Sequence, residues 1–240
     1  MFTGIIQSVA LISSITDKNG IRTFEIEFDS GFCQDLEIGA SVAVDGVCLT
    51  VTKILSPTRV TFDIMLKSLE ITTLSEYEQG QSINVERAAK DGAEIGGHPL
   101  SGHIDFKTNV LDVQQIDDNY RVRIAISDDW AKYIFAKGYI ALNGASLTVS
   151  DVNKQQGWFD VWLIPETRRM TTFESKNSGS SINVEIERGT QVVVDTVRDA
   201  INEKMGPLMP LFEKFLADNN ADLDVIGQAA QAALSDSSKK

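Results

Sequence analysis

Residues 1–97 and residues 98–187 of this chain repeat one pattern in the same order. The clearest match pairs Ser-Val-Ala-Val-Asp-Gly-Val-Cys-Leu-Thr-Val at 41–51 with Tyr-Ile-Ala-Leu-Asn-Gly-Ala-Ser-Leu-Thr-Val at 139–149. Shorter matches keep this order on either side, which chance similarity between two strands would not produce. Each copy is therefore expected to fold into a similar unit, and this restricts the fold more than composition does.

Most segments in both copies have the alternating, β-branched pattern of short β-strands. Residues 23–28, Thr-Phe-Glu-Ile-Glu-Phe, alternate apolar and polar side chains as a half-buried strand does. Asp45-Gly46 and Asn143-Gly144 lie between apolar runs and predict tight hairpin turns. Further strands are predicted at residues 60–65, 82–86, 121–126 and 158–163, and short helices at residues 31–36, 66–74, 128–132 and 166–172. The pattern predicts a mainly β protein with one small closed barrel per copy.

The pattern changes after Glu187, so residues 188–240 are expected to form a separate helical segment and tail. Residues 191–205 place apolar side chains at helical spacing, and Pro207 and Pro210 interrupt this pattern. Residues 211–216 and 223–234 are predicted to be further short amphipathic segments. An amphipathic helix needs an apolar partner, either its own barrels or equivalent helices in an oligomer, and we favour the oligomer.

Composition excludes several classes of function. The 240 residues carry a net charge of −12 and show no cluster of Lys and Arg, which argues against binding to nucleic acid through phosphate neutralisation. No apolar run is long enough to span a bilayer, and the first residues lack the features of a secretory signal. Cys33 and Cys48 show no metal-ligand spacing. We therefore expect a cytoplasmic protein with reduced thiols.

Both histidines of the chain lie in residues 96–103, Gly-Gly-His-Pro-Leu-Ser-Gly-His, at the joint between the two copies. Two imidazoles without further ligands do not make a zinc site, so no metal is expected here. The repeat sets His103 opposite Ile5 at the start of its copy, whereas His98 has only the glycine turn around it. His103 is therefore the stronger candidate for chemistry, and His98 is assigned a structural role.

Cys48 and Ser146 occupy equivalent positions, each followed by Leu-Thr-Val. Two interpretations stay open at this point. In the first, the hairpin is simply followed by a small residue in both copies. Alternatively, each barrel presents a small nucleophile or hydrogen-bonding group beside Thr50 or Thr148, so that each barrel has one ligand pocket.

Six motifs carry a resemblance to a known family: Met1-Phe-Thr-Gly-Ile, Asp45-Gly-Val-Cys-Leu-Thr-Val, Asn84-Val-Glu-Arg-Ala, Gly96-Gly-His-Pro-Leu-Ser-Gly-His, Gly144-Ala-Ser-Leu-Thr-Val and Leu163-Ile-Pro-Glu-Thr. Together they resemble riboflavin synthases of the alpha-subunit type, in order, over about residues 1–200. The resemblance implies two six-stranded lumazine-binding barrels in a homotrimer held by C-terminal helices. It also implies an active site between the first barrel of one subunit and the second barrel of another.

The resemblance further implies a transferase that acts in the last step of riboflavin biosynthesis. Members convert two molecules of 6,7-dimethyl-8-ribityllumazine into riboflavin and 5-amino-6-(D-ribitylamino)uracil by moving a four-carbon unit, with no metal or organic cofactor. Lumazine synthase is a second protein partner to consider. Two stacked copies of one ligand are well held by two copies of one pocket.

Carried over by position, the resemblance implies substrate contacts in each copy. For the first barrel these are Gly4, Ile5, Ile6, Cys48, Leu49, Thr50, Asp63, Ile64, Met65, Leu66, Lys67 and Ser68. For the second barrel they are Gly102, His103, Ile104, Lys137, Ser146, Leu147, Thr148, Trp162, Leu163, Ile164, Pro165, Glu166 and Thr167. His103 is the candidate for proton transfer, and Cys48 and Ser146 are candidates for holding or delivering a nucleophile.

The chain departs from the family pattern in four places. Asn143 stands where Asp is usual, Glu187 stands where Asp is common, residues 66–68 replace a motif that ends in Glu-Thr, and the C-terminus is longer than usual. Asn keeps a hydrogen bond but cannot act as a base. The main alternative is a non-catalytic antenna protein of the same fold that binds lumazine or flavin, and the intact motifs around Cys48 and His103 favour the enzyme.

Overall fold

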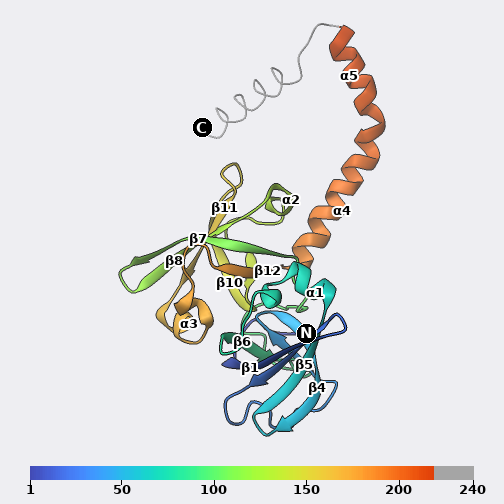
Figure 1. Cartoon of the computed structure of the whole chain (residues 1–240). Coiled ribbons are helices and arrows are strands. Elements are labelled where there is room, and N and C mark those ends of the chain that lie inside the picture. Colours follow the sequence, from blue (N-terminus) through green and yellow to red (C-terminus); the bar gives the residue numbers. More distant parts are fainter. Residues whose placement is uncertain (219–240) are drawn as a thin grey trace. The chain divides into compact units, whose positions relative to one another are not determined.

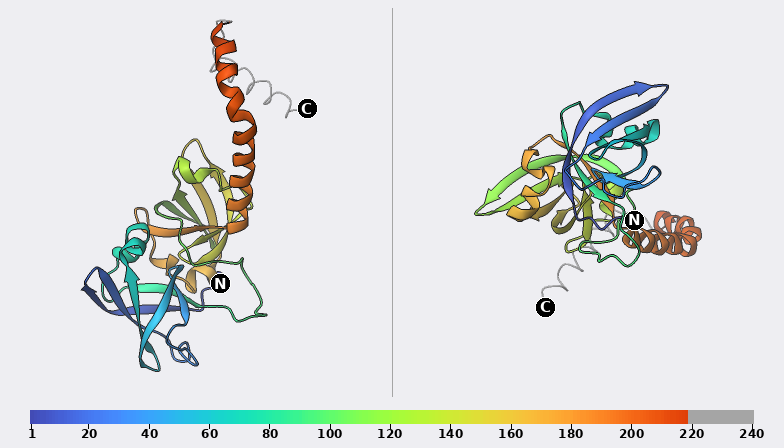
Figure 2. Two further views of the ribbon diagram at one scale, coloured as in Figure 1. Left: turned by 90° about the vertical axis from the view of Figure 1, so that its right-hand side faces the viewer. Right: turned by 90° about the horizontal axis from the view of Figure 1, so that it is seen from below.

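The computed structural model describes residues 1–218 and divides the chain into two units, the first of which is Met1–Gln191. This unit contains two closed antiparallel β-barrels, each of six strands (Figure 1). The predicted mainly β fold with one barrel per copy is therefore confirmed. The segment that joins the barrels, residues 88–105, is an extended loop without strands or helices (Figure 2).

The two barrels use equivalent strands. The first barrel closes in the order β1-β2-β5-β4-β3-β6 and consists of β1 (Ser8–Lys18), β2 (Ile21–Glu27), β3 (Ser41–Val44), β4 (Val47–Ser56), β5 (Arg59–Met65) and β6 (Ser82–Arg87). The second closes in the order β10-β11-β8-β7-β12-β9 and consists of β7 (Phe106–Ile116), β8 (Asn119–Ala125), β9 (Tyr139–Leu142), β10 (Ala145–Asn153), β11 (Trp158–Leu163) and β12 (Ser181–Ile186). Alternate side chains fill each barrel, with Phe24, Phe62 and Phe159 fully buried.

The hairpin turns follow the sequence prediction, whereas one of the helices does not. Asp45 and Gly46 both have positive φ, 44° and 81°, and Asn143 and Gly144 have 44° and 80°, as a two-residue type I′ turn requires. Three predicted helices correspond to α1 (Leu66–Ile71), α2 (Asp128–Ala131) and α3 (Pro165–Arg169). The helix predicted at residues 31–36 is wrong, because a left-handed residue at φ 56°, Asp35, makes this segment a series of turns.

Two buried asparagines at equivalent positions join the barrels reciprocally. Asn84 lies in β6 and Asn183 in β12, and both are fully buried. Each side chain accepts a hydrogen bond from a backbone N–H of the other barrel and donates one to a backbone carbonyl there. The four distances are 2.7–3.0 Å, and they connect Asn84 to Thr172 and Asn143, and Asn183 to Thr73 and Asp45. Satisfied buried amides of this kind fix one relative orientation of the two barrels.

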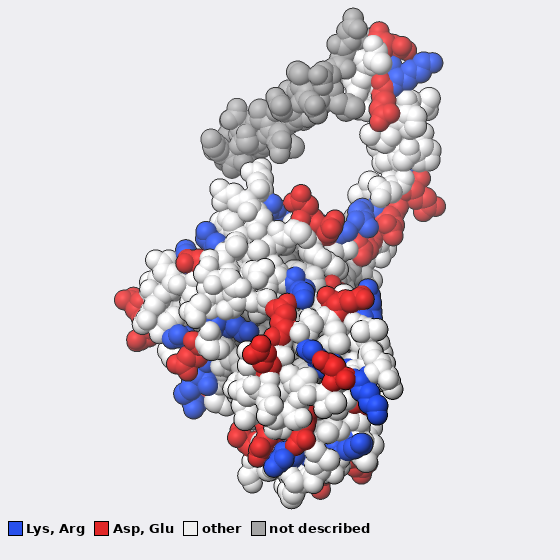
Figure 3. Space-filling view, in the orientation of Figure 1, with Lys and Arg blue, Asp and Glu red and all other residues white. Residues whose placement is uncertain are grey.

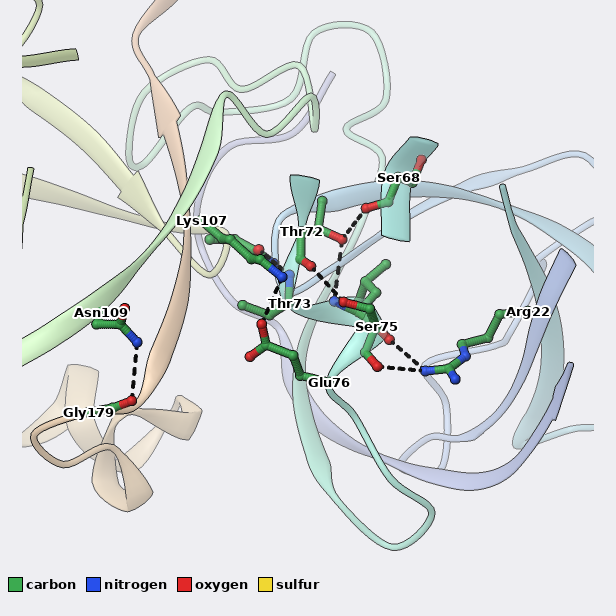
Figure 4. A network of polar contacts seen from close by, with 11 residues as sticks. Arg22, Ser68, Thr72, Thr73, Ser75, Glu76, Lys107, Asn109 and Gly179 are labelled. Carbon is green, nitrogen blue, oxygen red and sulfur yellow. Dashed lines mark hydrogen bonds and ion pairs between the residues drawn. The ribbon is translucent and has the colours of Figure 1, made fainter. Parts of the chain in front are cut away.

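Polar contacts at the edge of this interface hold the short 3-10 helix η1 (Thr73–Ser75), which carries Thr73 (Figure 4). Thr72 donates to the Ser68 carbonyl at 2.6 Å, and Lys107 of the second barrel lies 2.8 Å from the Glu76 carboxylate. On the other side, Arg22 donates to the carbonyl oxygens of Leu74 and Ser75. Contacts from both barrels therefore position the Thr73 backbone N–H, which donates to Asn183.

The two hairpin turns meet back to back, and glycine is required at their point of contact. A Cβ atom on Gly46 would lie 2.7 Å from the Gly144 nitrogen, and one on Gly144 would lie 2.8 Å from the Gly46 nitrogen. Both residues also have positive φ. A larger residue at either position would therefore push the barrels apart.

Beside this contact lies a carboxyl group, Asp45, that is fully buried. It accepts hydrogen bonds from the Tyr77 hydroxyl and, at 2.8 Å, from the Asn84 backbone N–H. Burial raises the pKa of Asp45 from 3.8 to about 6. Asn143 occupies the equivalent position and accepts from the Asn183 N–H at 2.7 Å. The departure noted at Asn143 thus lies in the interface between the barrels, where a hydrogen-bond acceptor is what the backbone needs.

The second unit starts at Val192, within helix α4 (Arg188–Met205), which is followed by a 3-10 turn and α5 (Met209–Asp218). The Glu187 carboxylate caps α4 by accepting from the backbone N–H groups of Gly189 and Thr190 at 2.8 and 2.6 Å. The apolar side chains predicted for this helix include Val193, Val197, Ile201 and Met205, each at least half exposed. The predicted segment at residues 223–234 lies outside the described residues.

Charges of both signs are mixed on the face that Figure 3 shows. On the face shown in Figure 3, Lys and Arg side chains stand among Asp and Glu side chains without forming a broad basic region. Within residues 1–218, no helix has the length and apolar character needed to cross a membrane.

We expect Asp45→Asn to reduce the pH dependence of stability. Because the folded protein holds the Asp45 proton to a higher pH than the unfolded chain does, the free energy of unfolding falls as pH rises from 3.8 to about 6. Between pH 5 and pH 7.5 the free energy of unfolding, measured with urea, should fall by roughly 1–1.5 kcal/mol more in the wild type than in the variant. Asp91→Asn, at an exposed carboxyl, should behave as the wild type. An equal loss in wild type and Asp45→Asn would contradict the buried-carboxyl account.

Gly46→Ala should destabilise the protein more than Gly80→Ala does. Both glycines have positive φ, 81° and 88°, so both substitutions strain the backbone by about 1–2 kcal/mol. Only Gly46 also has the other barrel against it, whereas nothing lies within 4 Å of a Cβ on Gly80. The excess cost at Gly46 should be about 1–3 kcal/mol in the free energy of unfolding. Equal costs would show that the turns do not press on each other in solution.

Candidate active site

A cleft of about 360 Å³ opens beside Ser146. Its lining comes from the start of the first copy and from β10, α3 and the two residues after α3 in the second copy, namely Gly4, Ile5, Ile6, Ala145, Ser146, Glu166, Thr167, Met170 and Thr171. Six of these nine residues were predicted to bind substrate. A volume in this range, with mixed apolar and hydroxyl groups, suits a small organic ligand.

The first copy reaches this cleft because Gly4 packs directly against Ser146. The Ser146 N–H donates to the Gly4 carbonyl at 2.8 Å, and a Cβ on Gly4 would lie 2.5 Å from the Ser146 Cβ. The buried Glu86 carboxylate holds the turn by accepting from the backbone N–H groups of Thr3 and Gly4 at 2.6 and 3.0 Å. Burial raises the pKa of Glu86. The fold of the first barrel thus delivers Gly4, Ile5 and Ile6 to the second.

The second copy makes the reciprocal arrangement at Cys48. The Cys48 N–H donates to the Gly102 carbonyl at 2.8 Å, and a Cβ on Gly102 would lie 2.6 Å from the Cys48 Cβ. Glu185 accepts from the Ser101 and Gly102 N–H groups at 2.7 and 3.1 Å, as Glu86 does in the first copy. We call the two assemblies the Ser146 half-site and the Cys48 half-site.

This grouping differs from the one expected from the sequence. Gly4, Ile5 and Ile6 were assigned to the pocket of the first barrel, with Cys48, but they line the cleft at Ser146. The segment from Gly102 to Ile104 was assigned to the second barrel, but Gly102 packs on Cys48. The physical reason is that each segment precedes the first strand of its barrel, and Phe2 and Leu100 pair with each other there as an antiparallel bridge. Each half-site therefore contains residues from both copies.

His98, which the sequence analysis assigned a structural role, contacts the predicted site residue Ser146. Its Nδ1 atom lies 2.6 Å from the Ser146 hydroxyl oxygen, and the ring is 2% exposed. Burial lowers the pKa of His98, while the Glu187 carboxylate raises it, with burial the larger effect. A neutral ring with its proton on Nε2 accepts the Ser146 hydroxyl proton at Nδ1, which is how a histidine activates a serine.

The signal for His98 was present in the glycine that precedes it. A Cβ on Gly97 would lie 2.4 Å from the Thr3 carbonyl oxygen and 2.6 Å from the Ser146 Cβ. Only glycine permits the loop to come this close, so the Gly-Gly pair sets the imidazole against Ser146. Pro99 restricts the backbone of His98 to extended conformations.

His103, the histidine favoured by the sequence, is exposed and follows Gly102 at the Cys48 half-site. Its backbone N–H donates to the Ser101 hydroxyl at 3.2 Å. The two histidines therefore belong to different half-sites, His98 to that of Ser146 and His103 to that of Cys48.

The other predicted contacts divide by the direction of their side chains. Those that point into the barrel cores, and so offer a ligand mainly backbone, are Leu49, Ile64, Ile104, Leu147 and Leu163. Those with exposed side chains are Thr50, Asp63, Met65, Leu66, Lys67, Lys137, Thr148, Trp162, Ile164 and Pro165, and Ser68 is half-buried. Strand alternation explains the division, because Cys48 and Thr50 share one face of β4 while Leu49 points inward.

Comparison with known proteins gives the family. The model of the lumazine binding domain matches the chain twice, at residues 3–88 and 101–187. Riboflavin synthase of Escherichia coli K12 is 44% identical over 198 residues, which cover 82% of this chain and 92% of that protein. The riboflavin synthases of Buchnera aphidicola and Mycobacterium bovis are 40% and 35% identical over 87% and 83% of this chain, and over 99% and 100% of their own lengths.

Solved structures agree on the fold. A crystal structure of LumP complexed with riboflavin has a TM-score of 0.72 at 27% identity and covers 78% of this chain and 100% of LumP. LumP complexed with 6,7-dimethyl-8-(1'-D-ribityl) lumazine has a TM-score of 0.70 at 26% identity, with the same coverage. With two lumazine binding domains and curated relatives along most of its length, this chain belongs to the riboflavin synthase family.

Proposed function

We propose that this chain is a transferase that forms riboflavin from two molecules of 6,7-dimethyl-8-ribityllumazine. The observation that carries the proposal is the pair of repeat-related half-sites, each built from both copies. The reaction joins two identical molecules, so two similar pockets with different reactive groups fit its chemistry. Holding both molecules in place removes about 7–11 kcal/mol of the barrier of a bimolecular step.

The Ser146 half-site supplies a serine–histidine pair, in which the histidine is buried and the serine lines the cleft. Ser146 is the group that adds to the lumazine ring or positions a water for addition, and His98 takes and returns its proton. The imidazole suits this role because its Nδ1 atom lies 2.6 Å from the Ser146 hydroxyl oxygen. Ile5 and Ile6 offer the apolar contacts for the ring system, and Glu166 and Thr167 supply polar groups at the same cleft.

The Cys48 half-site supplies a thiol in place of the hydroxyl and the exposed His103 in place of Ile5. His103 is proposed to transfer the proton from the activated methyl group of the lumazine. Its side chain is exposed, which fits a group that contacts substrate bound between two subunits.

We also propose a homotrimer in which the first barrel of one subunit faces the second barrel of another. The apolar side chains of α4 support this proposal, since Val193, Val197 and Ile201 are each more than half exposed. Exposed apolar rows at helical spacing are typical of helices that pack on one another in an oligomer.

The alternative function is that of a non-catalytic antenna protein that binds lumazine or flavin, and the LumP structures, which hold riboflavin or lumazine, share the fold. Sequence identity favours the enzyme, because the riboflavin synthases reach 35–44% whereas the LumP structures reach 26–27%.

A double-mutant cycle tests the serine–histidine pair with purified protein and 6,7-dimethyl-8-ribityllumazine, following riboflavin by absorbance and fluorescence. His98→Gln and Ser146→Ala should each lower kcat by roughly 10–100-fold. The double variant should be no slower than the slower single variant, because the two residues act as a unit. His103→Gln combined with Ser146→Ala should instead multiply the two losses, since these residues lie in different half-sites.

Two results would count against these assignments. Multiplicative losses for His98 and Ser146 would show that they do not act together. If the wild type binds lumazine stoichiometrically but forms no riboflavin, the chain is an antenna protein and not the enzyme.

Charge placed on the apolar row of α4 should break the trimer. Val197→Lys with Ile201→Lys should reduce the mass in multi-angle light scattering from three chains to one. Asp199→Lys with Glu203→Lys, at exposed polar positions of the same helix, should leave three chains. A wild-type mass of one chain, or a trimer in the Val197 and Ile201 variant, would refute assembly through α4.

A further inference from the structure

Tyr139 contacts the histidine of the His98–Ser146 pair. Its ring stacks on the His98 imidazole with centroids 5.1 Å apart and planes 16° from parallel. Tyr139 is the first residue of β9, and β9 pairs with β10 so that Tyr139 lies opposite Thr148 and Ala141 opposite Ser146. The tyrosine and the serine therefore stand on neighbouring strands, with the imidazole reaching both.

The stacking partner belongs to one copy alone. At the equivalent position the first copy has Ser41, which pairs with Thr50 in the same register as Tyr139 with Thr148. The rest of the two hairpins matches closely, so the frame of the barrel does not call for an aromatic residue here. The difference coincides with the half-site that has the buried histidine.

Packing explains what the tyrosine adds. Gly97 and Pro99 fix the backbone of His98, but they leave the rotation of the imidazole about its Cβ–Cγ bond open. Among residues 1–218, Nε2 of His98 has no hydrogen-bond partner, so no second polar contact orients the ring. The flat face of Tyr139 stacks on this ring and so opposes a rotation that would turn Nδ1 away from Ser146.

Tyr139 is not part of a hydrophobic core. Its side chain remains 56% exposed although His98 is 2% exposed. A tyrosine that served as core would be expected to lose most of its surface. Its stacked ring instead shields the imidazole from water, and this contributes to the burial that lowers the pKa of His98.

We propose that Tyr139 is a positioning residue, which orients the His98 ring for proton exchange with Ser146. The inference rests on the proposed function, and it adds a residue that touches His98 rather than the reacting atoms. Stacking requires the ring and not the hydroxyl, so phenylalanine should replace tyrosine and an aliphatic residue should not.

The test compares Tyr139→Leu with Tyr139→Phe in the full-length protein, by kinetics and by NMR of the histidine rings. The chain has only two histidines, so a His103→Gln protein assigns the signals of His98. Tyr139→Leu should lower kcat by roughly 10–100-fold with KM changed less than about threefold, because the misplaced ring affects the proton transfer rather than binding. Tyr139→Phe should stay within about threefold of wild type in both constants.

The NMR readout does not depend on turnover. In Tyr139→Leu the ring signals of His98 should lose the displacement caused by the stacked aromatic ring, and the pKa of His98 should rise towards its ordinary value. In Tyr139→Phe both should stay as in the wild type. A melting curve by circular dichroism confirms that both variants are folded before the comparison.

Three outcomes overturn the inference. In the first, Tyr139→Leu matches Tyr139→Phe in kcat. In the second, KM rises while kcat is unchanged, which would make Tyr139 a binding residue. In the third, the His98 ring signals are the same in both variants. If the wild type forms no riboflavin, the proposed function fails, and the ring signals alone still decide whether Tyr139 orients His98.

Discussion

The exchange of hydrogen bonds between Asn84 and Asn183 and the opposite barrels is the interaction on which the rest of the structure depends. Both amides are fully buried, and each is satisfied by backbone groups of the other copy. A buried amide left without its partners would cost about 1–3 kcal/mol, so any shift between the barrels is penalised at two equivalent points. The contact of Gly46 with Gly144 sets the separation, and the asparagines set the orientation.

The same interface produces the half-sites. With the barrels in this orientation, the segment before each barrel packs on the other copy. A buried glutamate, Glu86 or Glu185, accepts hydrogen bonds from the backbone N–H groups of that segment. Gly4 then lies on Ser146 and Gly102 on Cys48 at distances that only glycine permits. A substitution at the interface should therefore affect the candidate site, although the asparagines are not among the residues that line its cleft.

Sequence reasoning reached the fold because periodicity and turn chemistry are local. Alternation predicted most of the strands, though not β1 and β7, and Asp45-Gly46 and Asn143-Gly144 predicted the hairpins whose positive φ values the structure shows. The packing of Gly4, Ile5 and Ile6 against the second barrel was not predictable. A repeat shows which segments are alike, but not which barrel each segment packs against. The contact of His98 was missed because its partner, Ser146, lies 48 positions away in the sequence. The helix predicted at residues 31–36 failed locally, at the left-handed Asp35.

The two copies keep one frame and differ where chemistry is proposed. Most frame residues are paired alike, asparagine with asparagine and glutamate with glutamate, and Asp45 with Asn143 is the exception. The candidate site pairs a thiol with a hydroxyl and Ser41 with Tyr139. In the proposed reaction two identical molecules must take different roles, one giving and one receiving the four-carbon unit. A perfectly symmetric pair of pockets offers no basis for that difference. The His98–Ser146 pair beside Tyr139 sets one half-site apart, because its imidazole is 2% exposed, whereas His103 at the other half-site is exposed to water. The repeat thus supplies two matching pockets, and the few residues that break its symmetry distinguish their roles.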